Sequence, residues 1–125
     1  MAKILVSLHP ASAQQIIAGT KKYEYRRIRP KQAVTSMVIY VTEPVGMVVA
    51  EAEVLQCIEG TLEELWQMTT AQTEQSRQEV QNYFAGRETG CALQLGTVTL
   101  FQPPKTLQEY GIETPPRSFR YLPES

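Results

Sequence analysis

Charged and aromatic side chains alternate along one short segment of the chain, residues 19–29, with the sequence GTKKYEYRRIR. Interpreted as a β-strand from Lys22 onward, the segment places Glu24 between Lys22 and Arg26 on one face. The opposite face then carries Tyr23, Tyr25, Arg27 and Arg29. Cations contact phosphates and aromatic rings stack on bases, so this mixture suits a single-stranded nucleic acid. A surface strand with solvated charges and core-covering tyrosines has the same pattern, and both interpretations stay open.

The charge of the chain is strongly polarised, although its sum is close to zero. The 125 residues include 12 Lys+Arg and 13 acidic residues, for a net charge of −1, and every acidic residue is Glu. Residues 21–31 carry a net charge of +5, whereas residues 43–64 carry −6. The total therefore does not exclude a basic binding surface. The acidic face of residues 51–64 is either a solvated surface or a docking site for a protein partner.

The types of residue exclude most cofactor sites. A structural zinc site needs four ligands, and His9, Cys57 and Cys91 supply three at no recognisable spacing. The chain has no Asp for an EF-hand or an Asp-based two-metal centre, and neither GxxxxGK[ST] nor GxGxxG occurs. We expect no metal, no other cofactor, and two cysteines that are buried reduced thiols.

The chain has no segment typical of a membrane protein or of a secreted one. Glu43 and Pro44 interrupt the best apolar window, which is far shorter than the ~20 residues of a spanning helix. Residues 1–8 lack the features of a secretory signal. We therefore expect a cytoplasmic protein with no membrane partner.

Hydrophobic patterns predict the elements that must position the charged segment. Strands are expected at residues 3–8, 22–28, 36–42, 47–56 and 91–101, with an extended segment at 115–122 and a strand end at Pro103-Pro104. A short helix is expected from Pro10 to Gly19, and capping boxes at Thr61-x-x-Glu64 and Ser76-x-x-Glu79 open two more helices. These elements predict one α+β domain over residues 1–125: a partly closed β-barrel of about five or six strands, with a short helix after strand 1 and a helical pair before the last strands.

Strand alternation places Lys21 and Glu24 on opposite faces unless residues 20–22 bend or bulge. Convergence of Lys21, Glu24 and Arg26 on one pocket would favour a functional site. Divergence would favour a solvated strand.

Several of these residues resemble the motifs of a known family. The run Gly19-x-Lys21-x-x-Glu24-x-Arg26, preceded by SLHP at residues 7–10, resembles the ASCH family of PUA-like proteins. Trp66, the Tyr83-Phe84-x-Gly86 segment and Pro116-x-Ser-Phe119 extend the resemblance over nearly the whole chain. The resemblance implies a small PUA-like β-barrel whose cleft is lined by the GxKxxExR motif, and a role in binding RNA or another nucleic acid.

The leading hypothesis is a basic cleft that binds RNA, another single-stranded nucleic acid or a nucleoside-like small molecule. Lys21, Lys22 and Arg26 would contact phosphate or carbonyl oxygens, and Glu24 would accept from an exocyclic amine or orient Arg26. A weaker basic and aromatic segment near the C-terminus adds two candidates. The candidate ligand-binding residues are Lys21, Lys22, Tyr23, Glu24, Arg26, Tyr40, Arg117 and Phe119, with Tyr25 as a further stacking candidate.

The alternative is an enzyme that uses the same cleft. A small amidohydrolase acting on a modified nucleoside such as N4-acetylcytidine would use Lys21 as base and Glu24 as its acid partner. Relatives with that activity have a Thr nucleophile at the position of Glu24, and a carboxylate does not replace a hydroxyl in acyl transfer. A ribonuclease is the other enzymatic possibility implied by the resemblance. Whether the chain breaks any bond stays open at this stage.

Overall fold

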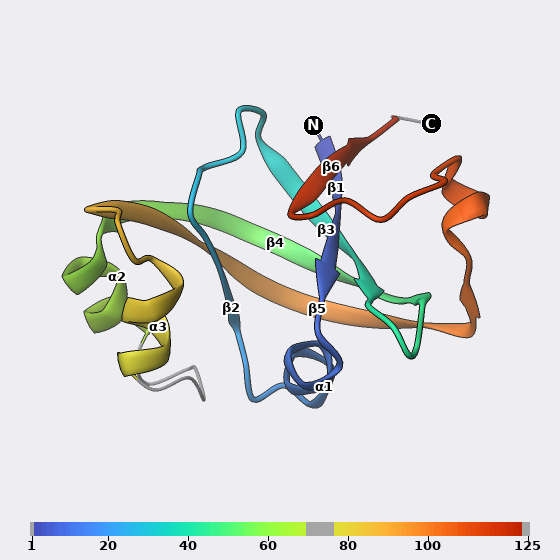
Figure 1. The fold of residues 1–125 in the computed structure, drawn as a ribbon, viewed down its shortest axis with the longest axis horizontal. Coiled ribbons are helices and arrows are strands. Elements are labelled where there is room, and N and C mark those ends of the chain that lie inside the picture. Colours follow the sequence, from blue (N-terminus) through green and yellow to red (C-terminus); the bar gives the residue numbers. More distant parts are fainter. Residues whose placement is uncertain (1, 70–76, 124–125) are drawn as a thin grey trace.

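The computed structural model describes residues 2–69 and 77–123 (Figure 1). In chain order, their elements are β1 (Ala2–Leu8), α1 (Pro10–Ala18), β2 (Tyr23–Arg26), β3 (Val34–Val41), β4 (Met47–Thr61), α2 (Leu62–Thr69), α3 (Arg77–Tyr83), β5 (Thr89–Lys105), the 3₁₀ helix η2 (Leu107–Tyr110) and β6 (Phe119–Leu122). The chain forms a small α+β fold, as the sequence predicts. The long β4 and β5 strands run side by side across the molecule, with α2 and α3 at one end and η2 at the other (Figure 1).

In the part of the chain that the structure describes, six strands form one mixed sheet in the order β2-β5-β4-β3-β1-β6. The β1–β3 pair is parallel, and the other pairs are antiparallel. The expected closed or partly closed barrel is wrong, because β2 and β6 are the two edges of this sheet and do not pair with each other. Closure requires backbone hydrogen bonds between the edges. Here a side chain bridges them instead: Arg26 of β2 donates to Ser118, directly before β6, at 3.1 Å.

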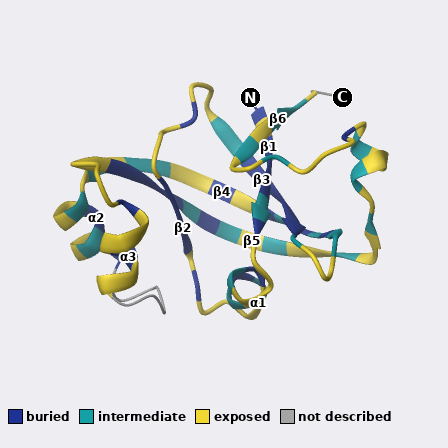
Figure 2. Ribbon diagram, viewed as in Figure 1, coloured by how far each residue is buried: buried dark blue, intermediate teal, exposed yellow. Residues whose placement is uncertain are grey.

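Within the described residues, the apolar core consists of three clusters distributed along the sheet. The main one packs α1, through Ile16, against β1, β3, β4 and β5. A second cluster joins β2 and β5 to α2 and α3, with Tyr25, Leu65 and Phe84 among its members. A third covers the other face of β1 and β3 near η2 and includes Tyr40. The buried positions follow β1, β2 and β3, whereas much of the surface of α2 and α3 is exposed (Figure 2).

In the second cluster, an aromatic ring packs so closely against β5 that only glycine fits at the contact. The ring of Phe84, which follows α3, lies against Gly90 of β5, where an added Cβ would collide with it. Tyr25 meets the same ring edge-on, with centroids 5.9 Å apart. This contact fixes the helical pair beside β2, the strand that carries the charged motif.

Local signals explain where several elements begin and end. The helix α1 starts at Pro10 and ends at Gly19, whose φ of 82° is in the left-handed region that favours glycine. The Thr61 capping box is present, with Thr61 N donating to Glu64 Oε1 at 2.8 Å and Glu64 N donating to Thr61 Oγ1 at 3.2 Å. Ser76 of the second predicted capping box lies outside the described residues.

Pro103 and Pro104 do not end β5, contrary to expectation. The strand continues to Lys105, which pairs with Val48 of β4, while the preceding pair joins Ala50 to Leu100. The two prolines therefore lie in an irregular stretch of the ladder, where their missing N–H groups break no regular hydrogen bond. The described residues include no helix long and apolar enough to span a membrane.

Candidate functional site

The turn between α1 and β2 determines which way Lys21 points. After Gly19, the backbone N–H groups of Thr20 and Lys21 both donate to the Gln15 carbonyl oxygen, at 3.1 and 3.2 Å. The strand β2 begins only at Tyr23, so Lys21 is not part of its alternating pattern. The bend over residues 20–22 brings Lys21 to the same side as Glu24.

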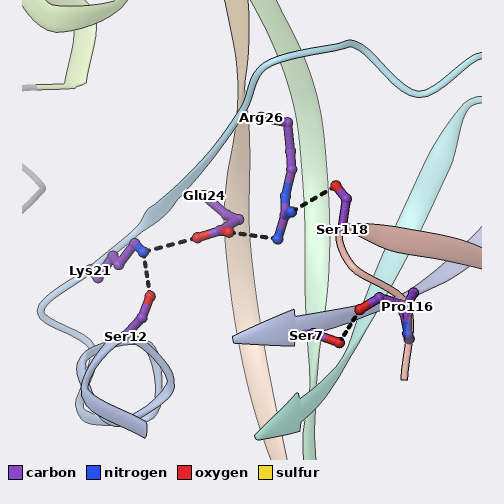
Figure 3. Close-up of polar contacts among 7 residues, drawn as sticks. All are labelled: Ser7, Ser12, Lys21, Glu24, Arg26, Pro116 and Ser118. Carbon is purple, nitrogen blue, oxygen red and sulfur yellow. Dashed lines mark hydrogen bonds and ion pairs between the residues drawn. The ribbon is translucent and has the colours of Figure 1, made fainter. Parts of the chain in front are cut away.

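Three charged side chains of the motif form a continuous chain of contacts (Figure 3). Lys21 Nζ lies 2.9 Å from Glu24 Oε1, and Arg26 Nη2 lies 2.8 Å from Glu24 Oε2. Both carboxylate oxygens of Glu24 are therefore engaged by cations. Lys21 also donates to Ser12 Oγ of α1 at 2.6 Å, and Arg26 Nη1 donates to Ser118 Oγ at 3.1 Å.

This charged triad is almost completely buried. Lys21 and Glu24 are 5% exposed and Arg26 is 6% exposed. One carboxylate offsets only one of two cations, so the triad carries a formal surplus of one positive charge. Arg26 Nε is buried and has no hydrogen-bond partner among the described residues. A buried cation with an unused donor is costly for stability and points to a binding role.

The triad lines a cavity of about 460 Å³. The volume is in the range typical of small-ligand sites. The residues that line it come from β1, α1, β2, the residues that flank these elements, α3 and the segment before β6: Ser7, Leu8, His9, Ser12, Lys21, Glu24, Tyr25, Arg26, Arg27, Tyr83, Arg117 and Ser118. Arg27 and Arg117 are exposed at this cavity and add positive charge to that of the triad.

The C-terminal segment is held in place through β1. Ser7 Oγ donates to the Pro116 carbonyl oxygen at 2.7 Å, and Ser7 N donates to the Ser118 carbonyl oxygen at 3.3 Å. These bonds continue the antiparallel β1–β6 pairing and position Arg117 and Ser118 at the cavity.

The sequence-predicted binding residues divide into two groups. Lys21, Glu24, Arg26 and Arg117 line the cavity together. The other candidates lie elsewhere: Lys22 is exposed beside a different hollow, Tyr23 and Tyr40 are buried in core clusters, and Phe119 packs against the main cluster and the ring of Tyr121. Tyr25 lines the cavity but is buried, and its hydroxyl contacts Thr69 Oγ1.

The aromatic ring with most access to the cavity belongs to Tyr83, which was not among the stacking candidates predicted from the sequence. Tyr83, the last residue of α3, is 37% exposed and packs edge-on against Phe84. Burial raises the pKa of Tyr83, so its hydroxyl keeps its proton at neutral pH. The sequence contained a signal for the exposure of Tyr83. Adjacent residues on a helix point in different directions, so Tyr83 and Phe84 cannot both face one core. Ser12 and Ser118 had no comparable individual signal.

The acidic residues of the 51–64 face are engaged within the chain. Glu51 contacts Ser36 and Lys3, Glu59 contacts Arg29, and Glu63 contacts Arg77. Glu64 caps α2. Docking of a protein partner on this face stays a prediction.

Comparisons with known proteins agree with the motif. A family model described as ASCH domain matches residues 6–100. The solved structure of ASCH from Zymomonas mobilis superposes with a TM-score of 0.86 at 28% identity, over 98% of this chain and 88% of that chain.

Two curated relatives cover nearly all of this chain. A Zymomonas mobilis protein named ASCH domain-containing ribonuclease is 30% identical over 122 residues, which are 94% of this chain and 82% of the relative. ATP synthase subunit alpha of Ureaplasma parvum serovar 3 is 28% identical over 120 residues, which are 95% of this chain. The chain spans only 15% of the length of that Ureaplasma protein.

Proposed function

Since this chain belongs to the ASCH domain family, we propose that it binds single-stranded RNA, or another ligand that contains a nucleobase, in the cavity around Lys21, Glu24 and Arg26. The observation that carries this proposal is the convergence of these three buried side chains on one cavity with surplus positive charge. Phosphate groups supply the opposite charge. The name of the Zymomonas mobilis ribonuclease supports RNA as the nucleic acid.

An aromatic ring beside the cations favours a single strand. Tyr83 lines the cavity together with Arg27 and Arg117. In a single strand the bases are free to stack on such a ring while the cations contact the backbone. In an A-form duplex the bases are stacked on each other and are not available to Tyr83.

Fluorescence anisotropy with short labelled single-stranded RNAs tests this function. We expect binding that weakens as salt rises, and a large loss of affinity in the Lys21→Ala/Arg26→Ala double variant. Arg117→Ala removes an exposed cavity cation and keeps the triad intact, so it tests the same site without disturbing buried charges. It should also weaken binding.

Lys105→Ala is the matched control. It removes one positive charge at the far end of β5, where Lys105 lies 4.4 Å from the Phe101 ring centroid and lines no part of the cavity. Circular dichroism checks that each variant folds. The proposal is wrong if wild-type binding does not depend on salt, or if Arg117→Ala and the double variant both bind like Lys105→Ala.

RNA cleavage is the second candidate function, and the name of the Zymomonas mobilis relative favours it. Among the cavity residues, His9 supplies an imidazole, a group that can act as a general acid or base, and Ser12 supplies a hydroxyl. End-labelled RNA incubated with the protein and separated by gel electrophoresis tests for cleavage. Cleavage lost in His9→Ala, with RNA binding retained, would assign a proton-transfer role to His9. Intact RNA after prolonged incubation would exclude this function for the RNAs tested.

Deacetylation of N4-acetylcytidine has less support. That reaction would need Lys21 to accept a proton, whereas Lys21 donates to Ser12 and is paired with Glu24. Both oxygens of Glu24 are also committed to cations. Release of cytidine above the level of a Lys21→Ala control would restore this possibility.

A further inference from the structure

At the charged triad, the carboxylate acceptor is engaged and donors are left over. Both oxygens of Glu24 accept from cations. Arg26 Nε has no partner, and the Lys21 ammonium uses two of its three hydrogens. Within the described residues, the guanidinium of Arg117 forms no hydrogen bond or ion pair.

Two serine hydroxyls add to this excess of donors. Ser12 Oγ accepts from Lys21, and Ser118 Oγ accepts from Arg26. Each hydroxyl oxygen that accepts in this way keeps its own hydrogen to donate elsewhere. Both serines line the cavity.

The N-terminus of α1 contributes at the same place. Leu8, His9 and Ser12 line the cavity, and the N-cap residue His9 makes no side-chain capping bond. Pro10 has no N–H, and the first N–H groups of an α-helix have no partner within the helix. The helix dipole places partial positive charge at this end, which favours an anion. The buried, unpartnered Nε of Arg26, which lines the same cavity, is an independent sign of a ligand.

A phosphate group matches this arrangement because, when ionised, it accepts hydrogen bonds through several oxygens and carries negative charge. A nucleobase edge presents donors as well as acceptors, and at the buried triad those donors would meet a carboxylate whose two oxygens are already paired with cations. The cavity walls therefore suit phosphate better than base.

The burial of Lys21 and Arg26 favours a terminal phosphate over an internal phosphodiester as the ligand. Lys21 and Arg26 are 5% and 6% exposed, so a ligand must enter the cavity to reach them. An internal phosphodiester has a nucleotide on both sides, and both would have to enter with it. A terminal phosphate enters alone, and the rest of the strand leaves past Arg27, Arg117 and Tyr83.

We infer that this cavity recognises a terminal phosphate, either at the end of a nucleic-acid strand or on a mononucleotide, rather than the internal backbone. The inference rests on the proposed function, whose site it shares. Beyond that function, it specifies which part of the ligand reaches the buried Lys21 and Arg26.

RNAs of one sequence with a 5′-phosphate, a 3′-phosphate or hydroxyls at both ends test this inference by anisotropy, with the label away from the tested end. We expect one phosphorylated RNA to bind at least about tenfold more tightly than the hydroxyl form, the effect of one charged hydrogen bond. Inorganic phosphate and a nucleoside monophosphate should compete, and the corresponding nucleoside should not. Competition by the monophosphate as strong as that of the RNA end would identify a mononucleotide as the ligand.

Two variants test whether the preference for phosphorylated ends arises in this cavity. Ser118→Ala removes one donor from the segment before β6, and Arg26→Lys removes the unpaired Nε but keeps the charge. Both should reduce the preference for phosphorylated ends, whereas Lys105→Ala should preserve it. Circular dichroism identifies a variant that does not fold, and the other variant then decides.

The outcomes separate this inference from the proposed function. RNA binding with equal affinity for all three ends would overturn the inference and leave the proposed function standing. Binding of inorganic phosphate or the monophosphate, without binding of any RNA, would overturn RNA binding but support the phosphate site. A preference for phosphorylated ends that survives in both Ser118→Ala and Arg26→Lys would place the phosphate outside this cavity and overturn the inference.

Discussion

Lys21 and Glu24 form a buried ion pair of 2.9 Å, although an uninterrupted strand would hold their side chains on opposite faces. The pair exists because α1 ends in a left-handed residue, Gly19, and the chain bends before β2 begins. The charged site therefore depends on a helix cap as much as on the strand. Arg26 then completes the triad from two positions further along.

Removal of Glu24 should destabilise the fold strongly. Glu24→Ala leaves Lys21 and Arg26 buried without their shared carboxylate, and loss of one partner from a buried charge network costs about 3–5 kcal/mol. The free energy of unfolding in urea measures the effect. Glu59→Ala is the control, since its pair with Arg29 is exposed at 53% and 59% and should contribute less than about 1 kcal/mol. Equal losses for the two variants would contradict the assigned burial of the triad.

Tyr83 should contribute to ligand binding by stacking. Tyr83→Ala removes the exposed aromatic ring at the cavity and should cost about 1–3 kcal/mol of RNA binding. Tyr83→Phe keeps the ring and should bind nearly as the wild type does. Anisotropy measures both variants. A large loss in Tyr83→Phe would assign the contribution to the hydroxyl and would argue against stacking.

Glu51 should make stability depend on acid pH. Burial alone would raise the pKa of Glu51, but the hydrogen bond from Ser36 and the ammonium of Lys3 outweigh it and lower the pKa below its usual 4.5. A carboxyl whose pKa is lower in the folded state stabilises the fold above its unfolded pKa and loses that contribution as pH falls through the folded pKa.

Urea unfolding over a pH series that descends from neutral to below 4.5 tests this dependence. Glu51→Gln should reduce the loss of stability at the acid end relative to the wild type. Glu113→Gln, at an exposed position, should retain the wild-type profile. Parallel wild-type and Glu51→Gln profiles would show that Glu51 makes no such contribution.

The two thiols should react slowly in the folded protein. Both cysteines are free, and burial raises the pKa of Cys91 to about 12 and also raises that of half-buried Cys57. Since the thiolate is the reactive form, alkylation by iodoacetamide at mildly alkaline pH should be slow until urea unfolds the chain. Mass spectrometry counts the modified sites, and a Cys57→Ser variant isolates Cys91. Rapid native modification of Cys91 in that variant would contradict its burial.

The sequence by itself determined the features that depend on neighbouring residues. Pro10 and Gly19 mark the ends of α1, the Thr61 capping box opens α2, and alternation correctly places Glu24 and Arg26 on one side of a strand. The GxKxxExR spacing also identified the family. These signals are local, because caps and alternation act over a few residues and need no distant partner.

Only the tertiary structure decided how the sheet ends and what surrounds the triad. The edge strands β2 and β6 do not pair with each other, and Arg26 reaches Ser118 across 92 positions of sequence. Tyr83 rather than Tyr23 or Tyr40 offers its ring to the cavity, because packing around Phe84 leaves Tyr83 exposed. Local sequence predicts which face of an element is apolar, but the partner of that face is set by long-range packing. The same long-range packing placed Ser12 and Ser118 beside the buried cations.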